Sequence, residues 1–230
     1  MTATIPVSTQ TTQTHSQWSA TDQRSSATWD EYLRTTDESA EQERVFFHAG
    51  ELWVRDMSWE GIDHAQVKDL FILLLGLWYV AHPEPIARSY SGCLMEKTGL
   101  AAAAPDLMLY VGEGAPVWQA GEPRRINLDM VRVPDLVGEI SDTTLASDLD
   151  EMKQLYAAIG IGEYWVVDVR GGRVLMFQVG DDGKYRECGE SAVLAGVTVD
   201  VLAATLGRLG EMGNMGAANW FMGQFINDSV

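Results

Sequence analysis

Two acidic residues, Asp106 and Glu139, stand at or inside apolar segments of the sequence, where a charge is unusual. Asp106 opens the apolar run of residues 106–111, and Glu139 lies within the run of residues 136–140. An unpaired buried carboxylate is costly, so a residue of this kind is a candidate metal ligand or catalytic group. If the two segments are neighbouring strands, both carboxylates can converge on one Mg²⁺ ion, which prefers oxygen ligands. Such an ion can activate water for attack on a phosphoryl group.

The elements expected around these two residues alternate between strands and helices. Residues 106–111 and 135–141 predict strands, and an alanine-rich turn is expected before the first of them. Residues 148–159 predict a helix with Asp148 as N-cap, Glu151 at the capping-box position and Gly160 as C-cap. The other expected elements are helices over 28–35, 63–81 and 199–209, a hairpin over 45–57, and strands over 86–95, 164–169 and 173–179. This mixture predicts an α/β fold with one domain over residues 28–209.

Both ends of the chain differ in composition from this domain. Residues 1–27 are rich in Thr, Ser and Gln and can bury little apolar surface, so a disordered N-terminal arm is expected. Residues 210–230 are expected to form a C-terminal tail with an aromatic patch at Trp220, Phe221 and Phe225. Burial of this patch against a second copy of the chain predicts a homodimer.

The overall charge limits the functions that the chain can have. The 230 residues carry a net charge of −17, which repels phosphate backbones and anionic lipids at long range. This argues against a general nucleic-acid coating protein but does not exclude an enzyme that uses a local metal ion to offset the repulsion. The longest apolar run, residues 70–81, is too short to span a bilayer, so a buried helix and no membrane partner are expected. Cys93 and Cys188 lie far apart, which favours a reducing, cytoplasmic location.

A series of motifs between Asp135 and Asp168 carries a family resemblance. It consists of Pro-Asp before a strand that contains Glu139, the run DLDEMKQLY over residues 148–156, and GIGEYWVVD over residues 160–168. This series resembles the Uma2 family of the PD-(D/E)XK nuclease superfamily, and a looser likeness extends over residues 29–209. The resemblance implies a restriction-endonuclease-like fold, with a mixed central β-sheet flanked by helices and an N-terminal hairpin. It also implies an endonuclease that uses Mg²⁺ or Mn²⁺ to hydrolyse phosphodiester bonds in DNA.

The resemblance assigns roles to three residues of the expected site. Asp106 matches the metal-binding aspartate of the family, and Glu139 matches the acidic residue on the next catalytic strand. The superfamily often has Lys where this chain has Ser141, whereas the Uma2 family carries its lysine on the following helix. That family position falls on Met152 here, and Lys153 is the next residue. Lys153 lies about 100° further round the helix, so its long side chain must bend back to act as the third catalytic residue.

Two functions follow from these assignments. The first is a metal-dependent endonuclease in which Asp106 and Glu139 hold the metal and Lys153 assists the attack of water. The second is a catalytically inactive nuclease-like binding or scaffold protein. Met152, the net charge of −17, and Phe46 at a position where the family often has Glu favour this alternative. A third interpretation, an unrelated acidic α/β domain, requires the family likeness to be coincidental.

Three residues near these motifs have simpler structural interpretations. His64 opens the helix expected over residues 63–81, so support of the helix start is expected rather than metal binding. Tyr156 lies on the apolar face of its helix, which is typical of a core residue. Asp168 closes an apolar strand and is expected in a turn.

Overall fold

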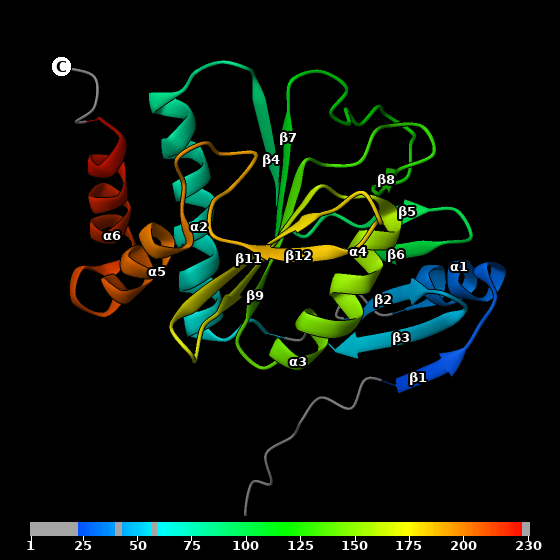
Figure 1. The fold of residues 1–230 in the computed structure, drawn as a ribbon. Helices are drawn as coiled ribbons and strands as arrows, with labels where there is room; N and C mark the ends of the chain where they lie inside the picture. The colour runs from blue at the N-terminus through cyan, green and yellow to red at the C-terminus, as the bar shows by residue number, and fades with distance from the viewer. Residues whose placement is uncertain (1–22, 40–42, 57–58, 227–230) are drawn as a thin grey trace, which may run out of the picture.

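The computed structural model describes residues 23–39, 43–56 and 59–226, which form two six-stranded sheets with helices around them (Figure 1). The second sheet has the strand order β12-β11-β10-β9-β7-β4, in which β9 and β10 are parallel and the other pairs antiparallel. Its strands are β4 Ala87–Tyr90, β7 Leu107–Val111, β9 Leu136–Ser141, β10 Glu163–Asp168, β11 Arg173–Val179 and β12 Tyr185–Cys188. The predicted α/β architecture is therefore confirmed.

The first sheet contains the predicted hairpin. β2 (Glu43–His48) and β3 (Glu51–Asp56) are joined by Ala49 and Gly50, which have φ angles of 53° and 81°. Positive φ at both central residues is what a two-residue type I′ turn requires, and Gly50 adopts it without strain. Helix α1 (Trp29–Glu38) packs against β2, and the Thr28 N-cap forms a capping box with Glu31. The N-terminal part of the domain thus follows its sequence pattern.

The rest of the first sheet departs from the sequence-based expectations. The sheet order is β1-β3-β2-β6-β5-β8, and the expected alanine-rich turn is strand β6 (Ala101–Ala103). Its small side chains are fully buried between β2 and β5 (Met95–Lys97), with β8 (Ile126–Asn127) at the edge. β1 (Gln23–Ser26) pairs with β3, so the prediction of disorder is wrong for residues 23–26. Residues 1–22 of the expected arm lie outside the described residues.

Three helices pack on one face of the second sheet: α2 (Ile62–Ala81), α5 (Val199–Gly207) and α6 (Leu209–Ile226) (Figure 1). α2 is long and apolar enough to span a membrane by length and composition, but six of its side chains are buried in this core. Those side chains are Val67, Leu70, Phe71, Leu74, Leu75 and Trp78. Packing inside the fold therefore accounts for the apolar composition of α2.

Residues 209–226 are helical rather than the predicted tail, with a break in the helix at Gly213, and residues 227–230 of that tail lie outside the described residues. α6 packs along α2, and Phe221 is only 1% exposed in the shared core. Phe225 packs against Phe221, and the Arg208 guanidinium lies 3.7 Å from the centre of the Trp220 ring. The aromatic patch is thus packed within its own chain, and the homodimer stays a prediction.

The helix on the opposite face of the second sheet begins earlier than predicted and contains a wide turn. α3 (Leu145–Ser147) leads into a π-helical turn, Asp148–Met152, which is followed by α4 (Lys153–Ile159). Asp148 is therefore inside the helical segment, and the prediction that it is the N-cap is wrong. The predicted apolar face is confirmed, because Met152, Leu155 and Tyr156 are fully buried. Gly160, with φ 88°, ends the helix as predicted.

Candidate active site

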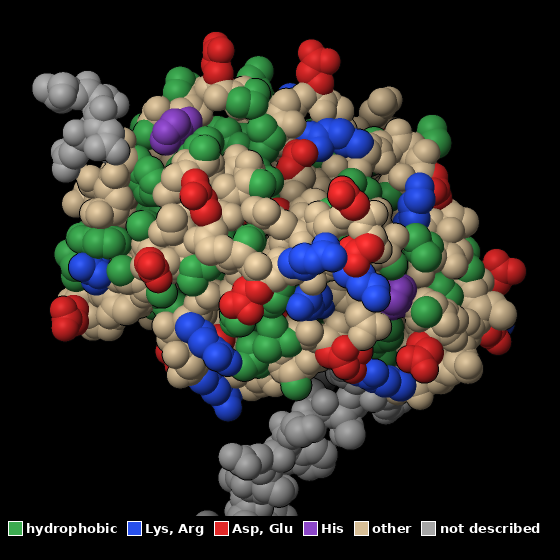
Figure 2. All heavy atoms as spheres, viewed as in Figure 1, with side chains coloured by type: hydrophobic (Ala, Val, Ile, Leu, Met, Phe, Trp, Pro, Cys, Tyr) green, Lys and Arg blue, Asp and Glu red, His purple; other side chains and the backbone are tan. Residues whose placement is uncertain are grey.

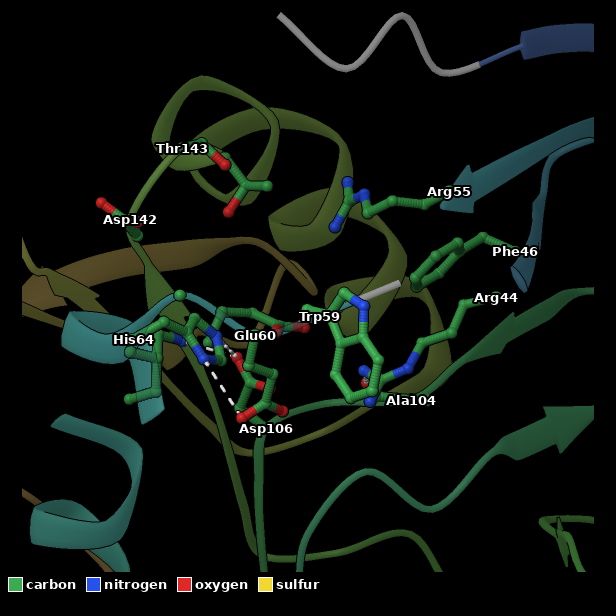
Figure 3. Close-up of a pocket in the computed structure, with 14 residues that line it drawn as sticks. Arg44, Phe46, Arg55, Trp59, Glu60, His64, Ala104, Asp106, Asp142 and Thr143 are labelled. Atoms are coloured by element: carbon green, nitrogen blue, oxygen red, sulfur yellow. Dashed lines mark hydrogen bonds and ion pairs between the residues drawn. The ribbon is translucent and has the colours of Figure 1, made fainter. Parts of the chain in front are cut away.

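A cavity of about 170 Å³ lies where the β2–β3 hairpin of the first sheet meets the second sheet (Figure 3). Four segments that are distant in the sequence line it: the hairpin, the start of α2, the residues before β7, and the end of β9 with the loop that follows. The side chains that matter for its chemistry are Arg44, Phe46, Arg55, Trp59, Glu60, His64, Asp106 and Glu139. The cavity therefore contains both carboxylates that the sequence singles out.

The pairing of β7 with β9 brings Asp106 and Glu139 together. In this antiparallel pair, Leu107 is opposite Gly138. One step further along the same register, Asp106 is opposite Glu139, and opposed residues point to the same face of a sheet. Both side chains are buried, with exposed fractions of 5% and 8%. The structure thus places the two carboxylates as neighbours at one cavity.

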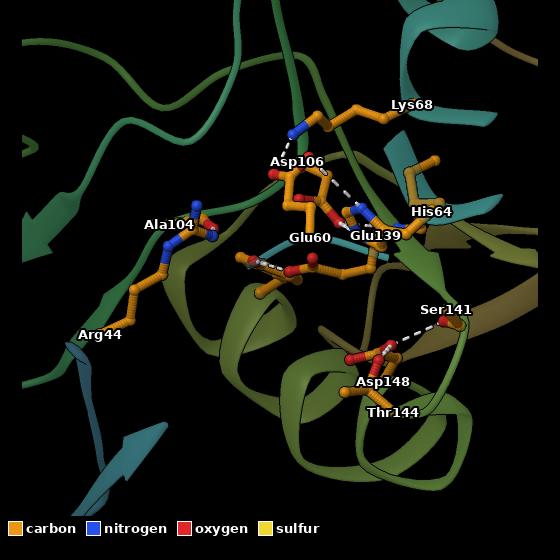
Figure 4. Close-up of polar contacts among 12 residues, drawn as sticks. Arg44, Glu60, His64, Lys68, Ala104, Asp106, Glu139, Ser141, Thr144 and Asp148 are labelled. Atoms are coloured by element: carbon orange, nitrogen blue, oxygen red, sulfur yellow. Dashed lines mark hydrogen bonds and ion pairs between the residues drawn. The ribbon is translucent and has the colours of Figure 1, made fainter. Parts of the chain in front are cut away.

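Asp106 is held as a carboxylate by two donors. Its Oδ2 accepts a hydrogen bond from the backbone N–H of Ile140 at 3.0 Å and one from His64 Nε2 at 3.2 Å (Figure 4). Burial raises the pKa of Asp106, but the hydrogen bonds and charge of these donors outweigh burial and lower it below the usual range. The Arg44 charge acts in the same direction. Asp106 is therefore ionised and correctly oriented before any ligand binds.

His64 belongs to the site, which the sequence-based interpretation did not predict. It lies in the first turn of α2, and its Nδ1 is 3.8 Å from Oε2 of Glu60, which also pairs with Lys68. Burial lowers the pKa of His64, but the hydrogen bond to Asp106 and the charges of Asp106 and Glu60 give a net upward shift. His64 therefore tends to be protonated beside an ionised Asp106.

Glu139 experiences the opposite electrostatic environment. Its Oε1 accepts a hydrogen bond from the Tyr156 hydroxyl at 2.5 Å. Burial and the charges of Asp106 and Asp148 raise the pKa of Glu139 well above its usual range. Tyr156 is fully buried, as expected for a core residue, yet it also fixes the orientation of a site carboxylate. Glu139 is thus favoured in its protonated form in the absence of a cation.

Asp148 adds a third buried carboxylate behind Glu139. Its Oδ2 accepts hydrogen bonds from Ser141 at 2.6 Å and from Thr144 at 2.5 Å (Figure 4). Its Oδ1 has no hydrogen-bond partner among the described residues. Burial raises the pKa of Asp148, although these two hydroxyls oppose the shift. Asp148 does not line the cavity, and its charge contributes to the raised pKa of Glu139.

The structure does not bring Lys153 to the two carboxylates. The Lys153 ammonium lies 3.8 Å from the centre of the Phe177 ring, on strand β11, and Lys153 does not line the cavity. Met152 occupies the buried side of the helix, one turn before Tyr156. The predicted catalytic role of Lys153 stays a prediction, and it requires the side chain to leave Phe177.

The donor set suits a hard divalent cation. Within residues 23–39, 43–56 and 59–226, no group of three or more His, Cys, Asp or Glu side chains is arranged to hold a metal ion. Mg²⁺ usually takes only one or two carboxylates and completes its shell with water and substrate phosphates. Asp106 and Glu139 therefore fit such an ion, whereas a structural zinc site needs four protein ligands.

One carboxylate just before β7 and one on β9 meet at a cavity that the N-terminal hairpin also lines, in a mixed α/β fold of the restriction-endonuclease-like class. The chain belongs to the Uma2 family, described as "Putative restriction endonuclease", whose family model matches residues 29–205. The fold is similar to the crystal structure of a "putative nuclease belonging to DUF820" from Anabaena variabilis, with 17% sequence identity and a TM-score of 0.51. That match covers 78% of this chain and 98% of the other. No curated protein matches the chain in sequence. Together these findings support a nuclease-like function.

Proposed function

We propose that the chain is a metal-dependent endonuclease that hydrolyses phosphodiester bonds in DNA, with Asp106 and Glu139 as ligands of Mg²⁺ or Mn²⁺. The observation that carries this proposal is the opposition of two buried carboxylates at one cavity in a member of the Uma2 family. A divalent cation in such a site lowers the pKa of a water molecule and stabilises charge on the phosphoryl group.

The residues around the carboxylates prepare them for different parts of this task. The His64 and Ile140 donors keep Asp106 ionised and fix one of its oxygens, so its other oxygen can face the cavity. Glu139 must lose its proton when a cation binds, because a ligand carboxylate is needed in its ionised form. The Tyr156 hydroxyl then continues to orient Glu139. Cation binding is therefore expected to release a proton.

Cleavage of supercoiled plasmid and of single-stranded DNA in Mg²⁺ or Mn²⁺ tests this function. We expect cleavage by the native chain and a loss of at least about 100-fold in both Asp106→Ala and Glu139→Ala, since each removes transition-state charge stabilisation. The matched control is Glu187→Ala, at an exposed position on β12, which should cleave like the native chain. Cleavage that survives both cavity substitutions contradicts the proposal.

Replacing Met152 by Lys is expected to accelerate cleavage. The new ammonium would lie one turn from Tyr156, whose hydroxyl donates a hydrogen bond to Glu139, and would supply the cation that the family resemblance implies at this position. A well-placed proton donor or acceptor contributes roughly 100-fold or more, so an increase of about that size is expected. Met152→Gln, which lacks the charge, is the control and should not accelerate the reaction.

The companion variant Lys153→Met tests the predicted role of Lys153 directly. Because the Lys153 ammonium lies over Phe177, we expect the cleavage rate of Lys153→Met to stay close to that of the native chain. A large loss of rate would instead show that Lys153 reaches the cavity during the reaction.

The buried Met152 also supports the second candidate function, a catalytically inactive nuclease-like binding or scaffold protein. This function predicts no cleavage by the native chain in either metal. Two further proposals are independent of the chemistry: a cytoplasmic location and a homodimer. Light scattering that gives the mass of one chain would contradict the homodimer.

A further inference from the structure

Two arginines face each other across the hairpin at the mouth of the cavity. Arg44 on β2 is directly opposite Arg55 on β3, and both side chains line the cavity. Figure 3 shows the two guanidinium groups extending from the hairpin toward the side where Asp106 lies. Like charges at directly opposed positions of a strand pair destabilise the pairing. The repulsion between the two opposed arginines is offset if both of them bind the same anion.

Neighbouring groups hold both guanidinium groups in place. The Arg44 Nη1 donates a hydrogen bond to the carbonyl oxygen of Ala104 at 3.3 Å. Arg55 donates one to the Ser147 hydroxyl at 3.3 Å, and its guanidinium lies 5.1 Å from the centre of the Phe46 ring. The planar arginine side chain offers several donors and matches the geometry of a phosphate better than lysine does. The pair is therefore preorganised for a phosphodiester.

The charges of the cavity become more complementary to a phosphodiester when a cation is bound. In its absence the Arg44 charge acts on Asp106 and the Arg55 charge acts on Glu139. The two arginines carry their charges with or without the metal, and a divalent cation held by the carboxylates would add to their attraction for a phosphodiester. On the face shown in Figure 2, acidic and basic side chains are interspersed. With a net charge of −17, attraction for phosphate must come from a local site of this kind.

A large aromatic side chain stands beside the arginines. Trp59 lines the same cavity, and 91% of its surface is exposed. An exposed indole face can stack on a nucleobase, a contact that single strands offer and that paired bases inside a duplex do not. Trp59 and the two arginines can thus engage the base and the phosphate of one nucleotide.

From this arrangement we propose that Arg44, Arg55 and Trp59 bind one nucleotide of a single DNA strand, with its phosphodiester directed toward Asp106 and Glu139. The proposal rests on the nuclease function proposed above and names its preferred substrate form. The two arginines bind the phosphodiester, and Trp59 stacks on an unpaired base.

Binding measured without metal tests the proposal separately from catalysis. Fluorescence anisotropy of a short labelled single strand, titrated in EDTA at several salt concentrations, gives the affinity and its salt dependence. Arg44→Gln and Arg55→Gln should each weaken binding and reduce the slope of log K against log salt by about 0.7, the value for one lost contact to a single strand. Trp59→Ala should weaken binding by about 5- to 150-fold with an unchanged slope. A duplex of the same sequence should bind more weakly than the single strand.

Matched variants make this test specific. Arg186→Gln removes an exposed arginine on β12, outside the cavity, and should leave the slope unchanged. Arg44→Lys and Arg55→Lys keep the charge and should restore most of the slope, and thermal unfolding confirms that each variant is folded. Native-like binding by the Gln variants, an equal effect of Arg186→Gln, or tighter binding of the duplex would overturn the proposal. If the Gln variants bind like the native chain while the native chain cleaves DNA, the single-strand proposal fails and the nuclease function remains supported. If the variants weaken binding as expected but the native chain does not cleave, only the nuclease function fails.

Discussion

In the metal-free protein, Glu139→Gln is expected to raise the free energy of unfolding at neutral pH by about 1–2 kcal/mol, a gain typical of single stabilising substitutions. Glu139 is buried, and burial with the charges of Asp106 and Asp148 raises its pKa well above the usual range. In the unfolded chain the same side chain ionises at its ordinary pKa. Stability that the protonated form contributes is therefore lost as the pH rises toward the folded-state pKa. Glutamine avoids this loss, and its carbonyl oxygen can still accept the Tyr156 hydrogen bond.

Thermal unfolding in EDTA at about pH 5 and about pH 8 measures this effect. A gain of about 1–2 kcal/mol corresponds to roughly 2–8 °C in a chain of this size, and it should be larger at the higher pH. Glu187→Gln, at an exposed position on β12, is the control and should change little. A variant that melts below the native chain at both pH values would show that the Glu139 carboxyl group stabilises the metal-free fold.

Addition of metal should reverse the order of the melting temperatures of the native chain and Glu139→Gln. A ligand at about 100 times its dissociation constant stabilises the protein that binds it by about 2.7 kcal/mol. Mg²⁺ or Mn²⁺ should thus raise the melting temperature of the native chain, whereas Glu139→Gln lacks a ligand carboxylate and should respond little. An equal response of both proteins would place the ion elsewhere.

Asp106→Asn is expected to destabilise the fold by about 3 kcal/mol, the opposite sign to the effect at Glu139, because it removes one partner of a buried ion pair. The pKa of Asp106 is lowered, so its contribution is present above its unfolded-state pKa and disappears as the pH falls through the folded-state pKa. The pKa of His64 is raised, so its contribution is complete below its unfolded-state pKa and lost as the pH rises through the folded-state pKa. The loss of unfolding free energy caused by Asp106→Asn should therefore be largest between the unfolded-state pKa values of Asp106 and His64, at about pH 5–6.

Urea denaturation of the native chain and Asp106→Asn across this pH range checks the prediction. Asp181→Asn, in the exposed turn after β11, is the matched control and should have little effect at any pH. A cost that is the same at about pH 4, pH 5.5 and pH 8 would mean that the His64–Asp106 ion pair does not contribute to stability.

The four central strands of the second sheet are predictable from the sequence because they are apolar runs bounded by turn residues, whereas the edge strands β4 and β12 are not apolar. The carboxylates of Asp106 and Glu139 are likewise visible, since each interrupts or adjoins such a run. β6 is not visible, because alanine has a low strand propensity and only the packing between β2 and β5 makes it a strand. The π-helical turn leaves no mark either, because Met152, Leu155 and Tyr156 show the same buried spacing as in an α-helix.

The remaining part of the site depends on contacts between segments far apart in the sequence. His64 reaches Asp106 across 42 residues, and nothing in its local sequence distinguishes it from an ordinary helix-start residue. Arg44 and Arg55 lie at equal distances from the Ala49–Gly50 turn, which indicates that they are opposed in the hairpin but not what their shared face approaches. Only the packing of the first sheet against the second defines the cavity between them.

The packing of α6 along α2 has a consequence for where the folded unit ends. The family model ends at residue 205, whereas α6 covers residues Leu209–Ile226 and buries Phe221 in the core. A chain truncated at the end of the family match would leave apolar side chains of α2 in contact with water, a surface prone to aggregation. α2 also carries His64 in its first turn, about 20 Å along the helix from Trp78. A chain truncated at the end of the family match would therefore lose α6, which packs against α2, the helix whose His64 orients Asp106.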